Sequence, residues 1–197
     1  MFKKGLFAIM ISTAVLFAAC GDDKKTDEGK DSGKSKDGQT NVANDVNLNI
    51  ALPEGAIEFD LAEFGLGITA SIMAPEAAYI YDSELITDDS TYSQIIVQMS
   101  DNSDLRFSIG PCLESMTDIK NFIKQDMFRE FKRYLIEEDN GFIYEAVKNA
   151  DETTVYHFTI LIENGGNKYK IESDMFHDYT IDDISMLYAM AKTLKFK

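Results

Sequence analysis

Apolar and polar residues alternate along several segments in the first half of the chain, and this alternation predicts β-strands. Residues 46–52 carry apolar side chains at every second position, as in a strand with one buried face, and Pro53 ends the pattern. Similar patterns place the expected strands of this half at residues 46–52, 66–72, 79–85, 92–99 and 105–109. The turn-forming run from Asp101 to Asp104 separates the last two strands and predicts a hairpin between them.

The pattern changes to a helical period after residue 116. Thr117 is a good N-cap and Asp118 suits a first helical turn, where a carboxylate interacts favourably with the helix dipole. The apolar side chains that follow recur every three or four residues and form one stripe. They are Ile119, Ile123, Met127, Phe131, Tyr134 and Leu135. The stripe predicts one long helix that ends near Glu138.

Three more strands and a second helix are expected after this long helix. The strands lie at residues 142–147, 153–162 and 169–171. The run Asn164–Asn167 contains two glycines and predicts a tight turn between the last two of these strands. Thr180 then caps a C-terminal helix, with Asp183 three residues on as a partner in a capping box. The stripe expected to be buried in this helix is Ile181, Ile184, Leu187, Tyr188, Ala191 and Leu194.

These elements together predict a single α+β domain over residues 46–197. Hairpin connections imply an antiparallel sheet, and helices in separate blocks imply a sheet flanked by the long central helix and the C-terminal helix. This order of elements is similar to that of the PsbP-like fold. The resemblance implies a single antiparallel sheet flanked by helices and, by analogy, a binding or assembly role.

Residues 1–19 have the features of a secretory signal peptide. Lys3 and Lys4 form a positive start, and the run from Gly5 to Ala19 is uncharged and mostly apolar. A helix of this length is too short to cross about 30 Å of hydrocarbon comfortably. We therefore expect the segment to direct export and to take no part in the fold.

The end of this segment indicates how it is processed. The run Leu16-Phe17-Ala18-Ala19-Cys20 resembles the lipobox of bacterial lipoproteins, although Phe17 stands where that motif usually has leucine. The resemblance implies that Cys20 is acylated and becomes the new N-terminus. The acidic start that follows Cys20 is similar to that of many lipoproteins in the Bacteroidetes, which implies a lipid-anchored protein of the cell envelope. Its place would be the outer membrane, facing the periplasm or the surface. The alternative is that Cys20 is incidental within the signal.

Residues 20–45 are expected to be the lipidated cysteine and a flexible tether. After Cys20 the segment contains no aromatic residue and many Lys, Asp, Gly and Ser residues. Such a composition cannot bury enough apolar area to offset the entropy lost on ordering. Its mixed charges are expected to keep the tether soluble and to bind no partner.

The charge of the chain restricts its partners. Nineteen Lys and Arg stand against 34 Asp and Glu, which gives a net charge of −15 and argues against a nucleic-acid partner. Residues 49–105 contain no Lys or Arg, so the excess is concentrated there. A surface of one sign attracts a basic or cationic protein partner. The candidate acidic surface is Asp82, Glu84, Asp88, Asp89, Asp101 and Asp104. The alternative is that these acids are scattered and only favour solubility.

Candidate catalytic and metal-binding residues are few. Cys112 is the only cysteine after Cys20, and a nucleophilic cysteine needs a base such as His157 or His177 nearby. His177 also lies close in sequence to four aspartates, which are the ligand types of a divalent metal site. We expect these aspartates to favour a helix N-terminus and a loop, and we expect no metal or cofactor.

Two functions from different classes remain open at this stage. The first is a non-enzymatic lipoprotein that binds a ligand or protein at the envelope, through the acidic half and the tyrosines Tyr79, Tyr81 and Tyr92. The second is a weak or degenerate hydrolase that uses Cys112 or a carboxylate site. The first is the favoured hypothesis, so the chain is expected not to be an enzyme.

Overall fold

The computed structural model describes residues 41–42, 46–86, 90–101 and 103–197, which all lie within one compact unit of residues 36–197. The expected signal peptide and Cys20 lie outside the described residues, as does all of the expected tether except Asn41 and Val42. Within the described ranges, no helix has the length and apolar character needed to cross a membrane.

The central feature of the fold is an antiparallel sheet of eight strands in the order β1-β7-β8-β9-β10-β6-β5-β4. Its strands are β1 (Asn41–Val42), β4 (Tyr79–Ile86), β5 (Thr91–Gln98), β6 (Arg106–Pro111), β7 (Arg129–Glu137), β8 (Gly141–Lys148), β9 (Thr154–Asn164) and β10 (Asn167–Ser173). β4–β6 form one meander and β7–β10 form another. The two meanders are joined where β10 pairs with β6, with Ile171 opposite Ile109.

One face of this sheet is covered by the C-terminal helix and by a smaller sheet. α2 (Ile181–Ala191) packs against β9, β10 and β6 and against β3 (Ala70–Pro75). β3 pairs with β2 (Ala56–Asp60) and with β11 (Lys195–Phe196) in the three-stranded sheet. The main apolar core lies between these layers and includes the fully buried Phe107, Ile171 and Leu187. The expected cap is confirmed, because Thr180 and Asp183 form a reciprocal capping box at the start of α2.

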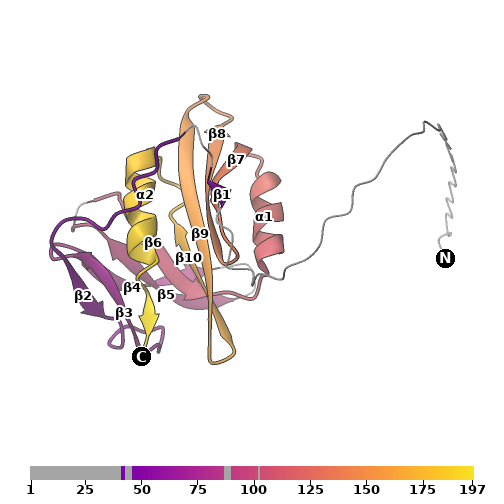
Figure 1. Cartoon of the computed structure of the whole chain (residues 1–197). Coiled ribbons are helices and arrows are strands. Elements are labelled where there is room, and N and C mark those ends of the chain that lie inside the picture. The colour runs from indigo at the N-terminus through magenta and orange to yellow at the C-terminus, as the bar shows by residue number, and fades with distance from the viewer. Residues whose placement is uncertain (1–40, 43–45, 87–89, 102) are drawn as a thin grey trace, which may run out of the picture. The chain divides into compact units, whose positions relative to one another are not determined.

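The opposite face of the sheet carries the other helix, α1 (Met116–Lys124), over its β7 end (Figure 1). Ile119 and Ile123 point from α1 into a second apolar cluster, which contains Phe142, Tyr144 and Val155. This cluster is smaller than the main core and lies mainly over β7, β8 and β9, with Cys112 after β6 as a further member.

The prediction of one long central helix over residues 117–138 is wrong. The N-cap lies two residues before the expected Thr117, because Ser115 forms a capping box with Asp118, and α1 ends at Lys124. Asp126 then accepts a hydrogen bond from the Phe128 amide, and β7 begins at Arg129. The register of β7 against β8 shifts at two places, between Phe131 and Arg133 and between Tyr134 and Ile136. These bulges break the strand period of two, so the apolar side chains of β7 imitate a helical stripe.

The α+β class is therefore corrected to a mainly antiparallel β architecture, with two short helices in the part of the chain that the structure describes. The single sheet implied by the PsbP-like resemblance is replaced by two sheets. Residues 46–52 form no strand, and β2 was not expected. The β4, β5 and β6 strands and the β8–β10 meander are confirmed, and the predicted turn after Asn164 places Gly165 and Gly166 at positive φ.

Candidate functional site

Half of one face of the large sheet carries no helix among the described residues. α1 covers the β7 end of that face, so the part formed by β10, β6, β5 and β4, on the side away from α2, has no helix over it. Because side chains alternate between the two faces of a strand, the register of these four strands identifies the residues on this part. We call it the open face. Its residues are Tyr79, Tyr81, Ser83, Leu85, Tyr92, Gln94, Ile96, Gln98, Arg106, Ser108, Lys170 and Glu172.

A groove follows the open face from β4 to α1. It consists of three adjoining hollows of about 210, 20 and 200 Å³, and Glu172 lines all three. Leu85 of β4 forms one side of the groove, and Phe122 of α1 lines the far end. Met175, in the loop after β10, lines both of the larger hollows. This open-face groove therefore has a mixed floor of polar and apolar side chains between apolar walls.

The charged groups on the groove floor are paired with one another. Lys170 Nζ lies 2.9 Å from Glu172 Oε1 and 3.9 Å from Glu114 Oε2. Burial lowers the pKa of Lys170, but the interactions with Glu172 and Glu114 together outweigh burial and raise the pKa above its usual value. The Lys170 ammonium is thus held charged in a partly enclosed position, where it can donate a hydrogen bond to a ligand.

A second ion pair closes the end of the groove nearest the β5–β6 turn. Arg106 donates two hydrogen bonds to Asp174 Oδ2, from Nε at 2.9 Å and from Nη2 at 2.7 Å. His177 Nε2 lies 2.9 Å from the same Nη2. Burial raises the pKa of Asp174, but the Phe176 amide and Arg106 together hold it below its usual value. This network fixes the loop that carries Met175 and Phe176.

Exposed aromatic side chains border the groove. Tyr79 is exposed and Tyr81 is half-buried on the open face of β4, outside the hollows, with ring centroids 5.1 Å apart. At the other side, Phe122 is 69% exposed and Phe176 is 91% exposed. Phe122 and Phe176 therefore add exposed apolar surface to the walls of the groove.

The candidate acidic surface does not coincide with the open face. Asp82 and Glu84 alternate with Tyr81 and Leu85 on β4 and therefore point to the other side of the sheet. There Asp82 Oδ1 accepts a hydrogen bond of 2.7 Å from the Gly65 amide. Asp101 and Asp104 lie at the β5–β6 turn, and Asp88 and Asp89 lie outside the described residues.

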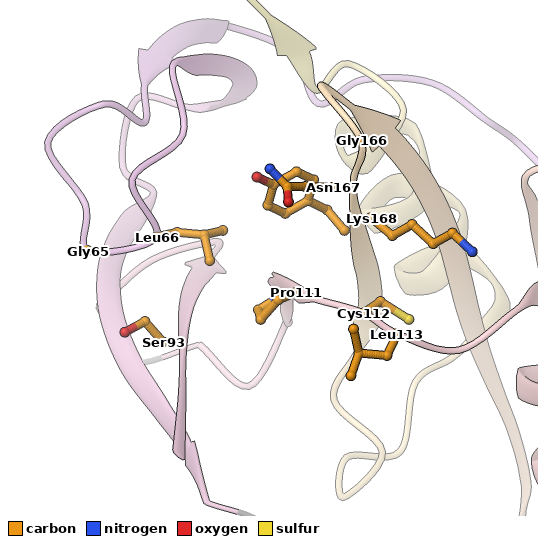
Figure 2. A pocket seen from close by; sticks show the side chains of 10 residues that line it. Gly65, Leu66, Ser93, Pro111, Cys112, Leu113, Gly166, Asn167 and Lys168 are labelled. Carbon is orange, nitrogen blue, oxygen red and sulfur yellow. The ribbon is translucent and has the colours of Figure 1, made fainter. Parts of the chain in front are cut away.

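Cys112 lines a different pocket of about 500 Å³, beside the β9–β10 hairpin. Figure 2 shows Leu66 and Ser93 on one side of this pocket and Cys112 and Leu113 on the other, while Lys168 extends away from it. Neither of the two histidines of the chain lines the pocket. The thiol lies 3.7 Å from Glu114 Oε2, and burial raises its pKa. A thiol in this state is a poor nucleophile.

We predict that Cys112 reacts slowly with a thiol reagent. In a Cys20→Ala variant, labelling by dithiobis-nitrobenzoate should be at least about a hundredfold slower in the native chain than in the denatured chain. The reason is that Cys112 is only 6% exposed and its thiolate is disfavoured. Equal rates in the two states would show that the pocket presents a reactive thiol.

The histidines occupy structural positions. His157 is fully buried between Tyr144 and Tyr179, and its Nδ1 lies 3.2 Å from Ser173 Oγ. Burial, with a smaller contribution from Arg129, lowers the pKa of His157 to about 3. The aspartates around His177 do not converge either, because Asp183 caps α2 and Asp178 pairs with Lys148. Among the described residues, no group of three or more His, Cys, Asp or Glu side chains could hold a metal ion.

The polar floor of the groove was missed by the sequence reasoning. Gln94, Ser108 and Glu172 alternate with buried apolar residues on their strands, so the period of two does assign them to the face opposite the core. The period of two does not predict that β6 pairs with β10, and this pairing is what brings the two meanders together.

Comparison with known proteins gives no guide to this site, since no family model, curated protein or solved structure matches the chain.

Proposed function

We propose that this chain is a lipid-anchored lipoprotein of the cell envelope whose domain binds a ligand or protein, without catalysis, in the open-face groove. The observation that supports binding most strongly is the half of the large sheet without a helix, which carries three adjoining hollows with exposed aromatic side chains in their walls. Ligand sites are typically concave and largely apolar, with a few polar groups that fix orientation. The membrane anchor rests on the lipobox-like run before Cys20.

The chemistry of the groove favours an extended amphipathic ligand. Lys170 and Glu172 are paired on the floor, where they can exchange hydrogen bonds with amide or hydroxyl groups. Leu85, Phe122 and Met175 offer apolar contacts on the walls. A peptide segment has both kinds of group, which supports a protein partner over a purely apolar lipid.

Site-specific photo-crosslinking in living cells tests this proposal. We expect a benzoylphenylalanine introduced at Gln94, on the groove floor, to give a discrete covalent adduct on irradiation. The matched control is the same residue at Glu130 of β7, whose side chain is 65% exposed and lies far from β5 in the order of strands. Adducts at Glu130 equal to those at Gln94, or none at Gln94, would contradict binding in the groove.

The hydrolase alternative is not proposed. The Cys112 thiol contacts Glu114, and the imidazole of His157 is buried beside Ser173. A Cys–His pair needs the two side chains within hydrogen-bond reach, and no such arrangement among the described residues supports catalysis here.

A further inference from the structure

We propose that the outer edge of β4 receives an extended segment of a partner protein, which adds a strand to the large sheet and carries basic side chains at alternate positions. The inference rests on the proposed function, because the added strand would border the open-face groove and form part of the bound ligand. It specifies how the partner is held and what chemistry it carries.

The hydrogen-bond register shows which backbone groups of β4 face outward. The Met99 amide donates to the Leu105 carbonyl at 3.0 Å, so odd-numbered residues of β5 bond to β6. Even-numbered residues of β5 therefore bond to β4, and their partners there have odd numbers, such as Tyr81 opposite Ile96. The amides and carbonyls of even-numbered β4 residues, including Asp82 and Glu84, consequently point away from the sheet.

This edge lacks most of the features that protect edge strands. β4 pairs in unbroken register with β5 from Tyr79 to Ile86, with no bulge, proline or lysine. In the described part of the chain, β5 is its only strand partner. The opposite edge of the sheet is β1, which is only two residues long. An edge strand that is long and regular is a template for the addition of another strand, and the acids of β4 restrict which strand can add.

The side chains of β4 define the chemistry of the added strand. Asp82 and Glu84 point to one side and are exposed, while Tyr81 and Leu85 point to the open face. Residues 79–98 contain no Lys or Arg to neutralise these acids. Opposite charges stabilise directly facing cross-strand pairs, so the partner should carry Lys or Arg opposite the acids. Its intervening residues should be apolar, because they extend the row that contains Tyr81 and Leu85.

The same charges argue against a second copy of this chain as the occupant. An antiparallel pair of β4 strands centred on Ser83 would place Asp82 of each chain opposite Glu84 of the other. Like charges in directly opposite positions destabilise a strand pair. A basic partner of different sequence is therefore the occupant that this edge favours.

Binding of synthetic peptides to the full mature chain in detergent tests the inference. The probe is a fluorescent octapeptide in which Lys and Val alternate, and the control peptide has the same residues in one block of Lys and one block of Val. We expect the alternating peptide to bind more tightly, because only it can place every Lys on the acidic side of an added strand. Binding would be measured by fluorescence anisotropy.

Two substitutions at Glu84 separate the contribution of backbone hydrogen bonds to binding from the contribution of charge. Glu84→Gln should weaken binding about threefold through loss of one cross-strand charge pair. Glu84→Pro should weaken it about tenfold or more, because it also removes an outward amide and strains the edge. Proline is tolerated where a strand amide faces away from the sheet, and thermal unfolding would verify that the variant folds. Ile86→Pro removes another outward amide without any change of charge, and it decides the question if Glu84→Pro does not fold.

Equal binding by the Glu84→Gln and Glu84→Pro variants, together with unchanged binding by Ile86→Pro, would overturn the proposal. Equal binding of the two peptides would also overturn it, because only non-specific charge attraction would then remain. Self-association of the chain that is abolished by Glu84→Pro would overturn it as well, because the edge would then bind a second copy. Each of these outcomes can be told apart from failure of the proposed function, because photo-adducts at Gln94 would still report a ligand in the groove.

Discussion

Replacing Cys20 with alanine is expected to abolish fatty-acid labelling of the chain and its retention in membranes. Each buried CH₂ group of an acyl chain contributes about 0.8 kcal/mol to membrane attachment, so the loss of several chains removes a stable anchor. Metabolic labelling with an alkyne analogue of palmitate, followed by membrane fractionation, would measure both effects.

The other cysteine provides the matched control for this experiment. Cys112 is buried in the cluster beneath α1 and should accept no acyl chain, so Cys112→Ala should label and fractionate as the parent does. A Cys20→Ala chain that keeps both its label and its membrane retention would refute the lipoprotein assignment. Loss of the label from the Cys112→Ala variant instead would show that the acyl chain is attached to Cys112 and not to Cys20.

The parts of the fold that sequence predicts well are those with local causes. In the β8–β10 meander, alternation identifies each strand, and two glycines at positive φ complete the turn between β9 and β10. The C-terminal helix is equally local, because Thr180 and Asp183 specify its start. In both cases the signal and the structure involve residues within a few positions of one another.

The long helix failed because two local signals conflicted and tertiary pairing decided between them. Phe131, Tyr134 and Leu135 have helical spacing, yet they belong to a bulged strand that pairs with β8 along its length. Bulges are set by the packing of that pair, and the partner strand begins only after the segment in question ends. A strand assignment would have required knowledge of this pairing.

The candidate site likewise has a part that local sequence predicts and a part that depends on tertiary pairing. The acids and tyrosines of β4 are adjacent in sequence, and a period of two already places Asp82 and Tyr81 on different faces. The sequence therefore already indicates that the acids and the tyrosines of β4 form two surfaces and not one. The groove itself depends on the pairing of β6 with β10, whose residues lie about 60 positions apart in sequence, as Ile109 and Ile171 do. No local pattern encodes that contact.

Acid should destabilise the protein through His157. Burial lowers the pKa of this histidine to about 3, whereas its ordinary value is 6.5. Between these values the unfolded chain binds a proton that the native chain excludes, so the free energy of unfolding decreases as the pH falls. The limiting slope is about 1.4 kcal/mol per pH unit, which amounts to several kcal/mol over the whole interval. Arg129 opposes the imidazolium, while Asp174 and Asp178 favour it more weakly.

A His157→Gln variant isolates this contribution. Its amide can still bond to Ser173, but it does not titrate, so urea unfolding between pH 5 and 6.5 should show a shallower pH dependence than in the parent. That window lies above the titration of carboxylates in the unfolded chain, so paired acids such as Asp174 contribute little there. The variant is expected to be less stable at neutral pH, because a polar amide replaces a ring packed between Tyr144 and Tyr179. The difference in slope is therefore the decisive quantity, and identical slopes would mean that His157 is protonated in the native protein or exposed to solvent.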